Sequence, residues 1–209
     1  MIIVHHLENS RSQRILWMLE ELGLPYEVKR YQRNKATMLA PPELKRIHPL
    51  GKSPTIEDTD DSRVIAETGA IVEYLVEKAD GRLGAPAHRD AALRYRFWLH
   101  YAEGSLLPPL FAKLVVGRVP LLGKAAQAKL QPMIDTHLDY VESELAQRPW
   151  FAGDQLTAAD IMMSFPLEAA RSRGGLDASR PATTAWLDKV HSRPAYQAAL
   201  KAGGPYAYA

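Results

Sequence analysis

The chain lacks cysteine altogether: none occurs among its 209 residues. This absence excludes a disulfide framework, a zinc–thiolate site and a Cys-x-x-Cys redox pair. Any thiol chemistry must therefore use a thiol that a bound ligand supplies. The seven histidines are scattered. Because no two of them stand at the helical spacing of metal ligands, we expect no metal site.

The chain also lacks a large net charge and long apolar runs. The 26 basic and 24 acidic residues leave a net charge of +2, and no basic run is interleaved with aromatics, so we expect no nucleic-acid partner. No apolar stretch approaches the roughly 20 residues that span a bilayer. The amino terminus has neither the basic start nor the apolar core of a secretory signal. We therefore expect a cytoplasmic protein with no membrane contact.

Strand and helix patterns alternate in the first part of the chain. Residues 2–6 alternate as a strand does, and residues 25–31 alternate again. Between them an amphipathic helix, for which Asn9, Ser10 and Ser12 are candidate N-caps, ends at Gly23. This strand–helix–strand order favours a parallel pair. A short helix after Pro41-Pro42 is expected next.

A hairpin and a helix complete this part. Residues 55–57 and 63–65 read as two strands around an aspartate-rich turn, and a helix follows over 69–79. Residues 80–86 form a glycine-rich linker. The fold class predicted for residues 1–80 is therefore α/β, a βαβ-ββα domain.

Beyond the linker the strand patterns stop, and the apolar residues recur at helical spacing. We expect residues 87–209 to form an all-α helical bundle domain. Its first helical stretch, 88–116, should be interrupted near Pro108-Pro109. The other expected helices cover 124–146, 158–171, 182–192 and 194–201.

Two short segments of the first domain suggest a ligand site. Pro54 interrupts a strand pattern, and if the Ser53–Pro54 bond is cis, the backbone N–H and C=O of Ser53 can turn toward a ligand. Glu67-Thr68 stands where a helix begins, so free N–H groups there suit an anion while Glu67 suits a cation. Together they could hold an extended small zwitterion.

Five segments in this order resemble the cytosolic glutathione S-transferase family, and most of all its bacterial and fungal GTT-like group. They are Ser10–Tyr26, His48–Pro54, Glu67-Thr68, Tyr101–Ser105 and Phe151–Asp160. The resemblance implies a thioredoxin-like first domain, glutathione as co-substrate without a metal, and a homodimer. It also implies conjugation of glutathione to small hydrophobic electrophiles, a detoxification reaction.

The resemblance implies a hydroxyl that stabilises the glutathione thiolate, and Ser10 is the first candidate. Asn9 is the alternative and Ser12 a more distant one, because loop length differs among branches of the family. A serine at this position is equally explained by capping of the following helix.

The resemblance also implies a glutathione-binding set. Lys52 would neutralise a carboxylate, Ser53 would pair main chain to main chain, Thr68 would hold the γ-glutamyl carboxylate and Glu67 would lie near its amino group. Singly, these residues are equally typical of a surface lysine and an ordinary helix start.

The helical half contributes pocket candidates. Tyr101, Leu107 and Phe111 would line the electrophile pocket, although ordinary core packing explains them as well. Thr157-Ala-Ala-Asp160 resembles a capping box, which we interpret as structural.

Two other functions share this resemblance. One is glutathione-dependent reduction of peroxides or mixed disulfides, which Asn9 beside the sulfur would favour. The other is a non-catalytic binding module of the same fold, which the intact Lys52 and Glu67-Thr68 disfavour.

Overall fold

A computed structural model of the chain describes residues 1–208. The chain divides into two compact units. The first comprises 1–84 and 191–207, and the second comprises 85–190 with Tyr208. Each unit is described by itself below.

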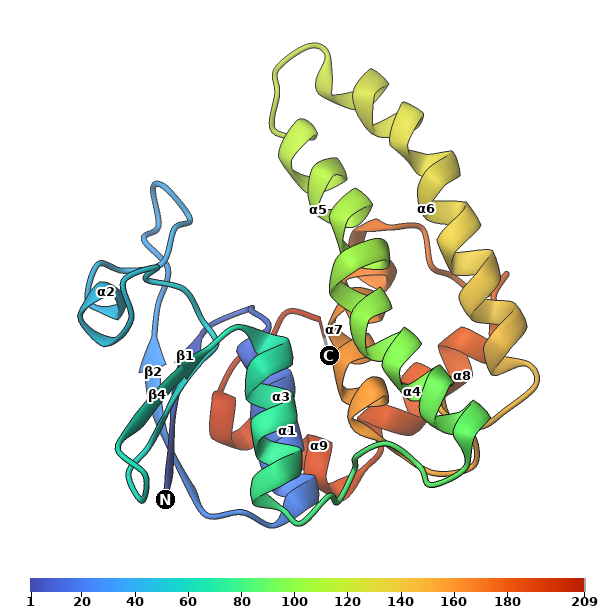
Figure 1. Ribbon diagram of the computed structural model, residues 1–209. Helices are drawn as coiled ribbons and strands as arrows, with labels where there is room; N and C mark the ends of the chain where they lie inside the picture. The colour runs from blue at the N-terminus through green and yellow to red at the C-terminus, as the bar shows by residue number, and fades with distance from the viewer. Residues whose placement is uncertain (209) are drawn as a thin grey trace. The chain divides into compact units, whose positions relative to one another are not determined.

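The first unit is built on a four-stranded sheet in the order β2-β1-β3-β4 (Figure 1). Its strands are β1 (Ile2–Leu7), β2 (Tyr26–Tyr31), β3 (Thr55–Asp58) and β4 (Arg63–Ala66). β1 pairs parallel with β2, whereas β3 pairs antiparallel with both β1 and β4. The predicted parallel pair and the predicted hairpin are both confirmed.

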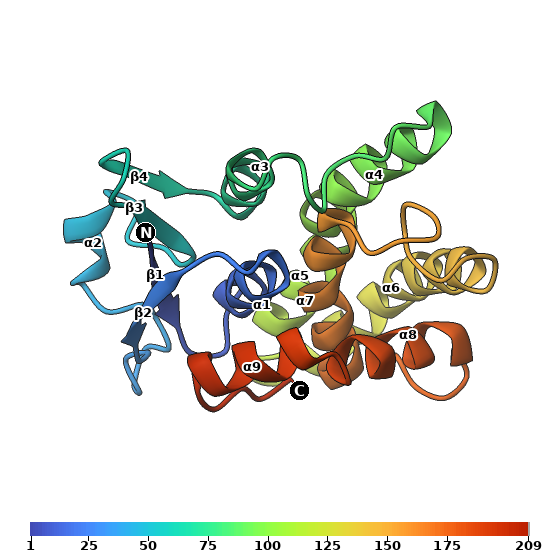
Figure 2. The same ribbon diagram turned by 90° about the horizontal axis from the view of Figure 1, so that it is seen from below.

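Helices cover both faces of this sheet. α1 (Ser12–Leu22) and α3 (Thr68–Lys78) lie on one face, and the short α2 (Leu44–Ile47) lies on the other (Figure 2). Gly23 ends α1 with a left-handed φ of 61°, as the sequence predicted. The α/β, thioredoxin-like class expected for this part of the chain is confirmed.

The strand register brings three loops to one end of the sheet. Thr55 lies opposite His5 on one side and opposite Ala66 on the other. Because β3 runs antiparallel to both neighbours, its entry lies beside the exits of β1 and β4. Residues 7–12, 52–54 and 67–68 therefore meet at this end.

α9 (Pro194–Gly203) belongs to the first unit by its contacts, although the sequence analysis assigned all of 87–209 to the helical domain. Tyr196 packs edge-on against Trp17 with ring centroids 5.6 Å apart. The Arg193 guanidinium donates to both carboxylate oxygens of Glu21, at 2.5 and 2.8 Å. Tertiary packing of this kind leaves no periodic signal in the sequence.

The second unit is all helical, as expected. Its helices are α4 (Arg89–Tyr101), α5 (Leu107–Val116), α6 (Gly123–Leu145), α7 (Ala158–Arg173) and α8 (Pro181–His191). A π-helical segment, η1 (Ala102–Leu106), joins α4 to α5, so the two run on as one rod (Figure 1). The interruption predicted near Pro108-Pro109 was wrong in position, because both prolines lie in the first turn of α5, where helix N–H groups have no partner anyway.

α7 is the core of this unit and is fixed at its start by Asp160. The side chain of Asp160 is completely buried. Its carboxylate accepts from the Thr157 N–H at 2.9 Å, the Thr157 hydroxyl at 3.0 Å and the Phe151 N–H at 3.0 Å. The capping box predicted from the sequence is present.

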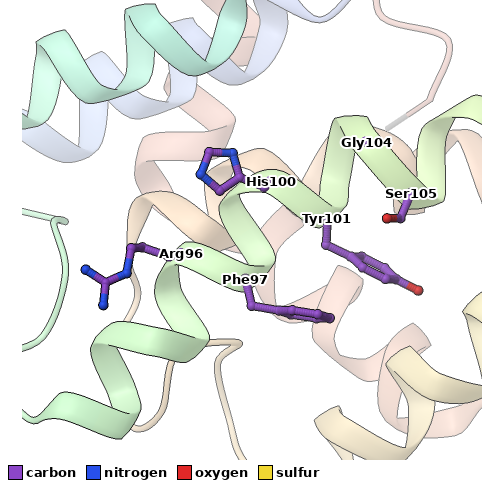
Figure 3. Close-up of a pocket in the computed structure, with 6 residues that line it drawn as sticks. All are labelled: Arg96, Phe97, His100, Tyr101, Gly104 and Ser105. Carbon is purple, nitrogen blue, oxygen red and sulfur yellow. The ribbon is translucent and has the colours of Figure 1, made fainter.

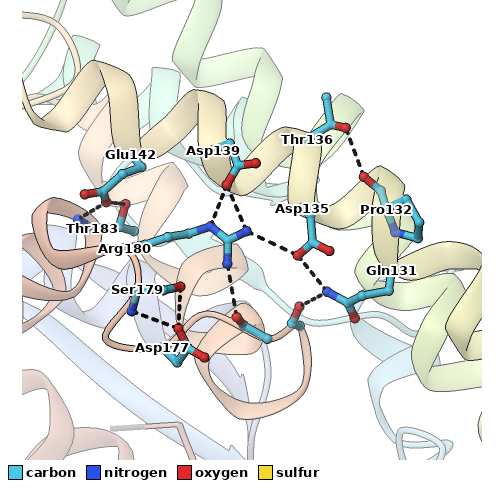
Figure 4. A network of polar contacts seen from close by, with 12 residues as sticks. Gln131, Pro132, Asp135, Thr136, Asp139, Glu142, Asp177, Ser179, Arg180 and Thr183 are labelled. Atoms are coloured by element: carbon cyan, nitrogen blue, oxygen red, sulfur yellow. Dashed lines mark hydrogen bonds and ion pairs between the residues drawn. The ribbon is translucent and has the colours of Figure 1, made fainter.

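An arginine ties the loop after α7 to α6. Arg180 donates to Asp139 at 2.9 Å, to Asp135 at 3.2 Å and to the Gly175 carbonyl at 3.2 Å. Figure 4 shows this network beside the Asp177–Ser179 turn. Across residues 1–208, no helix combines the length and the apolar character that a bilayer crossing requires.

Candidate functional site

Ser10 lies in the loop between β1 and α1 and is 5% exposed. Its Oγ accepts from the Ser12 backbone N–H at 3.3 Å and lies 2.8 Å from the Ser12 hydroxyl. The residue at the N-cap position of α1 is Arg11, not Ser10. Ser10 therefore accepts one N–H at the start of α1, as a capping hydroxyl does, so capping and a ligand contact both stay open as explanations of this serine.

Asn9 is held in the same loop in a left-handed conformation, with φ 50°. Its Oδ1 accepts from the Ala207 N–H at 2.8 Å, and its carbonyl accepts from Arg33 at 3.3 Å. The amide oxygen of Asn9 is thus engaged by the carboxyl-terminal segment, which makes its position depend on that segment.

The Ser53–Pro54 bond is cis, as considered in the sequence analysis. The Ser53 hydroxyl donates to the His5 carbonyl at 2.8 Å and accepts from the Leu7 N–H at 3.2 Å. The side chain is therefore directed into the protein. Within residues 1–208 no hydrogen bond uses the backbone N–H or carbonyl of Ser53, which leaves both for a ligand.

Glu67 and Thr68 form the start of α3. Glu67 is exposed and has φ 73° and ψ 121°, a conformation that costs a residue with a side chain about 1–3 kcal/mol. Thr68 is 4% exposed and is the first residue of the helix. Free N–H groups and the positive end of the α3 dipole favour an anion at this point.

Lys52 is exposed, and no carboxylate of the described chain pairs with its ammonium group. It is therefore available to a ligand carboxylate. Among residues 1–208 no group of three or more His, Asp and Glu side chains is arranged to hold a metal ion.

The residues described so far come to the same end of the sheet. The Leu7 N–H is shared between the Ser12 and Ser53 hydroxyls, both at 3.2 Å, and this joins the Ser10 loop to the Ser53 loop. Ala66, opposite Thr55, places Glu67-Thr68 beside them. The arrangement combines a buried hydroxyl, a free backbone pair, a helix start, an exposed acid and an exposed lysine, which suits an extended zwitterion.

The pocket candidates of the second unit have different surroundings. Tyr101 is buried, and its hydroxyl lies 2.5 Å from Nδ1 of His137. Burial, with a smaller contribution from Tyr140, raises the pKa of Tyr101 to about 12. Leu107 is 2% exposed and Phe111 is 55% exposed.

A cavity of about 380 Å³ lies along α4 and η1. Figure 3 shows the residues that line it, which are Arg96, Phe97, His100, Tyr101, Gly104 and Ser105. Tyr101 lines this cavity, whereas Leu107 and Phe111 do not.

Sequence reasoning missed His6 as part of the site. His6 is 2% exposed, and its Nδ1 lies 2.9 Å from the Ser12 hydroxyl, one step from Ser10. The sequence analysis regarded the histidines as scattered. The available signal was the alternation of β1, which places His6 on the same face as the buried Ile2 and Val4.

Comparison with known proteins identifies the family of this chain. Residues 10–78 match the family model for the glutathione S-transferase N-terminal domain, and residues 111–194 match that for the C-terminal domain. The chain is 38% identical to glutathione S-transferase 3 of Schizosaccharomyces pombe, over 96% of this chain and 87% of that protein. It is 35% identical to glutathione S-transferase 1 of Saccharomyces cerevisiae, over 94% of this chain and 93% of that one.

A solved structure is similar over the full length of the chain. The glutathione S-transferase of Actinobacillus pleuropneumoniae superposes with a TM-score of 0.88 at 37% identity, covering 100% of this chain and 95% of that one. With both family domains matched in order, the chain belongs to the cytosolic glutathione S-transferase family.

Proposed function

We propose that this glutathione S-transferase conjugates reduced glutathione to small hydrophobic electrophiles, with the Ser10 hydroxyl stabilising the glutathione thiolate. The observation that carries the proposal is the meeting of Ser10, Ser53 and Thr68 at one end of the sheet. If the thiolate is stabilised by about 2 kcal/mol, the pKa of a thiol falls from about 8.5 to about 7, so that about half of it is ionised at neutral pH. One charge-assisted hydrogen bond is of this size.

The remaining residues bind the tripeptide. Ser53 pairs by its main chain with the cysteinyl unit, and Lys52 neutralises a carboxylate. Thr68 holds the γ-glutamyl carboxylate at the start of α3, while Glu67 attracts the amino group. Catalysis then rests on a stabilised thiolate held close to the second substrate. Tyr101, Leu107 and Phe111 stay candidates for the electrophile pocket.

The test is the ultraviolet thiolate absorbance of bound glutathione as a function of pH. We expect the titration midpoint to rise by about one to two pH units in Ser10→Ala, and to be unchanged in Asn9→Ala. The exposed Ser143→Ala serves as a control. If only Asn9→Ala raises the midpoint, the assignment of Ser10 is wrong.

Two assays separate the reaction classes. Activity with a chloronitrobenzene, compared with cumene hydroperoxide on the same preparation, distinguishes conjugation from peroxide reduction. Calorimetry with glutathione tests the binding-module alternative. Binding tighter than about millimolar supports the enzyme, and no detectable binding contradicts it.

A cytoplasmic homodimer is also proposed. An aromatic face on α4 and α6 supports it, because Phe97 is 46% exposed and Tyr140 is 39% exposed. Light scattering after size exclusion measures the mass. We expect a dimer that Phe97→Glu weakens, and a monomeric wild-type protein would contradict the proposal.

A further inference from the structure

A chain of hydrogen bonds runs from Ser10 into the interior of the first unit. The Ser10 and Ser12 hydroxyls are 2.8 Å apart, and the Ser12 hydroxyl is 2.9 Å from Nδ1 of His6. The three residues are 5%, 0% and 2% exposed. We propose that His6 and Ser12 are positioning residues that turn the Ser10 proton outward, toward the ligand sulfur. This inference rests on the proposed role of Ser10.

The bonding capacity of Ser12 limits the possible arrangements. A hydroxyl has one proton and two lone pairs. The Leu7 N–H, at 3.2 Å, can only donate and occupies one lone pair. The other lone pair and the proton are left for His6 and Ser10, since the Leu7 carbonyl at 3.3 Å is a more distant acceptor.

The direction of the chain follows from what Ser10 must do. Ser10 Oγ already accepts the Ser12 backbone N–H. If Ser12 donates to Ser10 as well, both lone pairs of Ser10 are filled and its proton is free for an external acceptor. In this direction His6 carries its proton on Nδ1 and donates to Ser12. Every hydroxyl in the chain then uses its full capacity.

The opposite direction would make the chain a proton relay. The thiol proton would pass through Ser10 and Ser12, and His6 would have to keep it. Burial, and secondly the charge of Arg30, lower the pKa of His6 to about 4. An imidazole of this basicity cannot hold a proton released by a thiol of pKa about 8.5. The low basicity of His6 argues against a relay, and the hydrogen-bonding capacities of Ser10 and Ser12 support orientation.

The surroundings of His6 hold its ring in place. Arg30, opposite it on β2, donates to the Ala202 carbonyl at 2.6 Å. Gln13 on α1 and Gly203 on α9 complete the pocket, and a Cβ on Gly203 would lie 3.3 Å from His6 Cε1 and 2.5 Å from Gln13 Oε1. The charged group that acts on His6 among the described residues is Arg30.

The experiment uses Ser12→Ala, His6→Leu and His6→Asn, with Ser10→Ala as reference. Leucine removes the donor, whereas the asparagine N–H takes the place of Nδ1–H. The readouts are the thiolate titration midpoint, kcat and KM for glutathione, each on protein whose folding is verified by circular dichroism.

We expect Ser12→Ala and His6→Leu to raise the midpoint by about one unit, a tenfold loss of thiolate below it. The kcat near pH 6.5 should fall about five- to tenfold, while KM for glutathione stays within about twofold. His6→Asn should restore the midpoint. His6→Leu should add nothing in a Ser10→Ala background.

The outcomes separate the two proposals. If Ser10→Ala leaves the midpoint unchanged, the proposed role of Ser10 fails and the positioning role fails with it. If Ser10→Ala raises the midpoint but Ser12→Ala does not, only the positioning role fails. A purely structural role would lower the melting temperature without moving the midpoint. Should His6→Leu not fold, Ser12→Ala and His6→Asn decide.

Discussion

Replacing Asp160 by alanine tests whether a buried carboxylate fixes the start of α7. The change removes three hydrogen bonds and leaves the N–H groups of Phe151 and Thr157 buried without an acceptor. Each stranded donor costs about 1–3 kcal/mol. In the wild-type protein, burial raises the pKa of Asp160 to about 6. The ionised carboxylate is therefore destabilised at neutral pH by about 3 kcal/mol, and alanine relieves this. Two stranded donors together cost about 2–6 kcal/mol, so the net loss expected at neutral pH is at most about 3 kcal/mol.

The sign of the pH dependence sharpens this prediction. A folded pKa above the unfolded value of about 4 means that the stabilisation by Asp160 is complete below pH 4. It is lost as the pH rises through about 6. The wild-type protein should therefore exceed Asp160→Ala in unfolding free energy by more at about pH 5 than at about pH 7.5. The expected difference between the two conditions is about 1–2 kcal/mol.

Urea unfolding followed by tryptophan fluorescence at both pH values, at one protein concentration, measures these differences. Asp154→Ala is the matched control, since Asp154 is an exposed acid of the same loop and should change stability by less than about 0.5 kcal/mol. An effect of Asp160→Ala that is equal at both pH values, or larger at the higher one, would refute the reasoning. Turnover per folded molecule should be unchanged, and a selective loss of turnover would show a catalytic role.

Two further predictions concern packing and acid stability. Gly203→Ala should lower the free energy of unfolding by about 1–3 kcal/mol. The reason is that the added Cβ would lie 2.5 Å from Gln13 Oε1 and 3.3 Å from His6 Cε1. An unchanged melting temperature would mean that Gln13 moves aside freely. Burial by itself would raise the pKa of Asp58, but the hydrogen bonds from Lys78, Tyr74 and the Asp60 N–H together outweigh it and lower the pKa to about 2. The stabilisation that Asp58 provides is therefore present above about pH 4 and is lost as the pH falls through about 2. Unfolding followed by near-ultraviolet circular dichroism should show that wild type and Asp58→Asn differ less in unfolding free energy in acid than at neutral pH. An equal difference at both pH values would contradict this prediction.

Local signals in the sequence predicted most elements of the fold. Gly23 ends α1 because a left-handed residue is needed there, and that requirement can be read from the chain. The π-helical segment at 102–106 leaves no such signal in the sequence. The interruption of the helix was therefore predicted at Pro108 and Pro109 instead. The grouping of α9 with the first unit depends on Trp17 and Tyr196, which meet only in three dimensions.

The candidate site, like the fold, was predicted from the sequence only in part. Ser10 was predicted from the family resemblance, and Ser53 and Glu67-Thr68 were predicted from that resemblance together with Pro54 and the helix start; their roles stay predictions. The connection among them was not visible, since it depends on one amide, the Leu7 N–H, that reaches both Ser12 and Ser53. Sequence spacing reports which residues lie in a loop, but not which hydroxyl receives which N–H.

The Ser53 side chain offers a last prediction. Its hydroxyl is directed to the His5 carbonyl and the Leu7 N–H, so the ligand side of Ser53 is main chain. Ser53→Ala should therefore keep KM for glutathione within about twofold and lower stability by about 1 kcal/mol.

Thr68→Val is the matched contrast, since it removes a hydroxyl proposed to touch the ligand carboxylate while keeping the side-chain shape. A hydrogen bond to a charged group contributes about 1.5–3 kcal/mol, so its KM should rise about tenfold or more. Steady-state kinetics with glutathione varied at a saturating electrophile compares the two variants. If Ser53→Ala raised KM as much as Thr68→Val, the serine hydroxyl would contact glutathione itself, and the main-chain assignment at Ser53 would be wrong. The reason is that a hydroxyl committed to His5 and Leu7 has no proton left for a ligand.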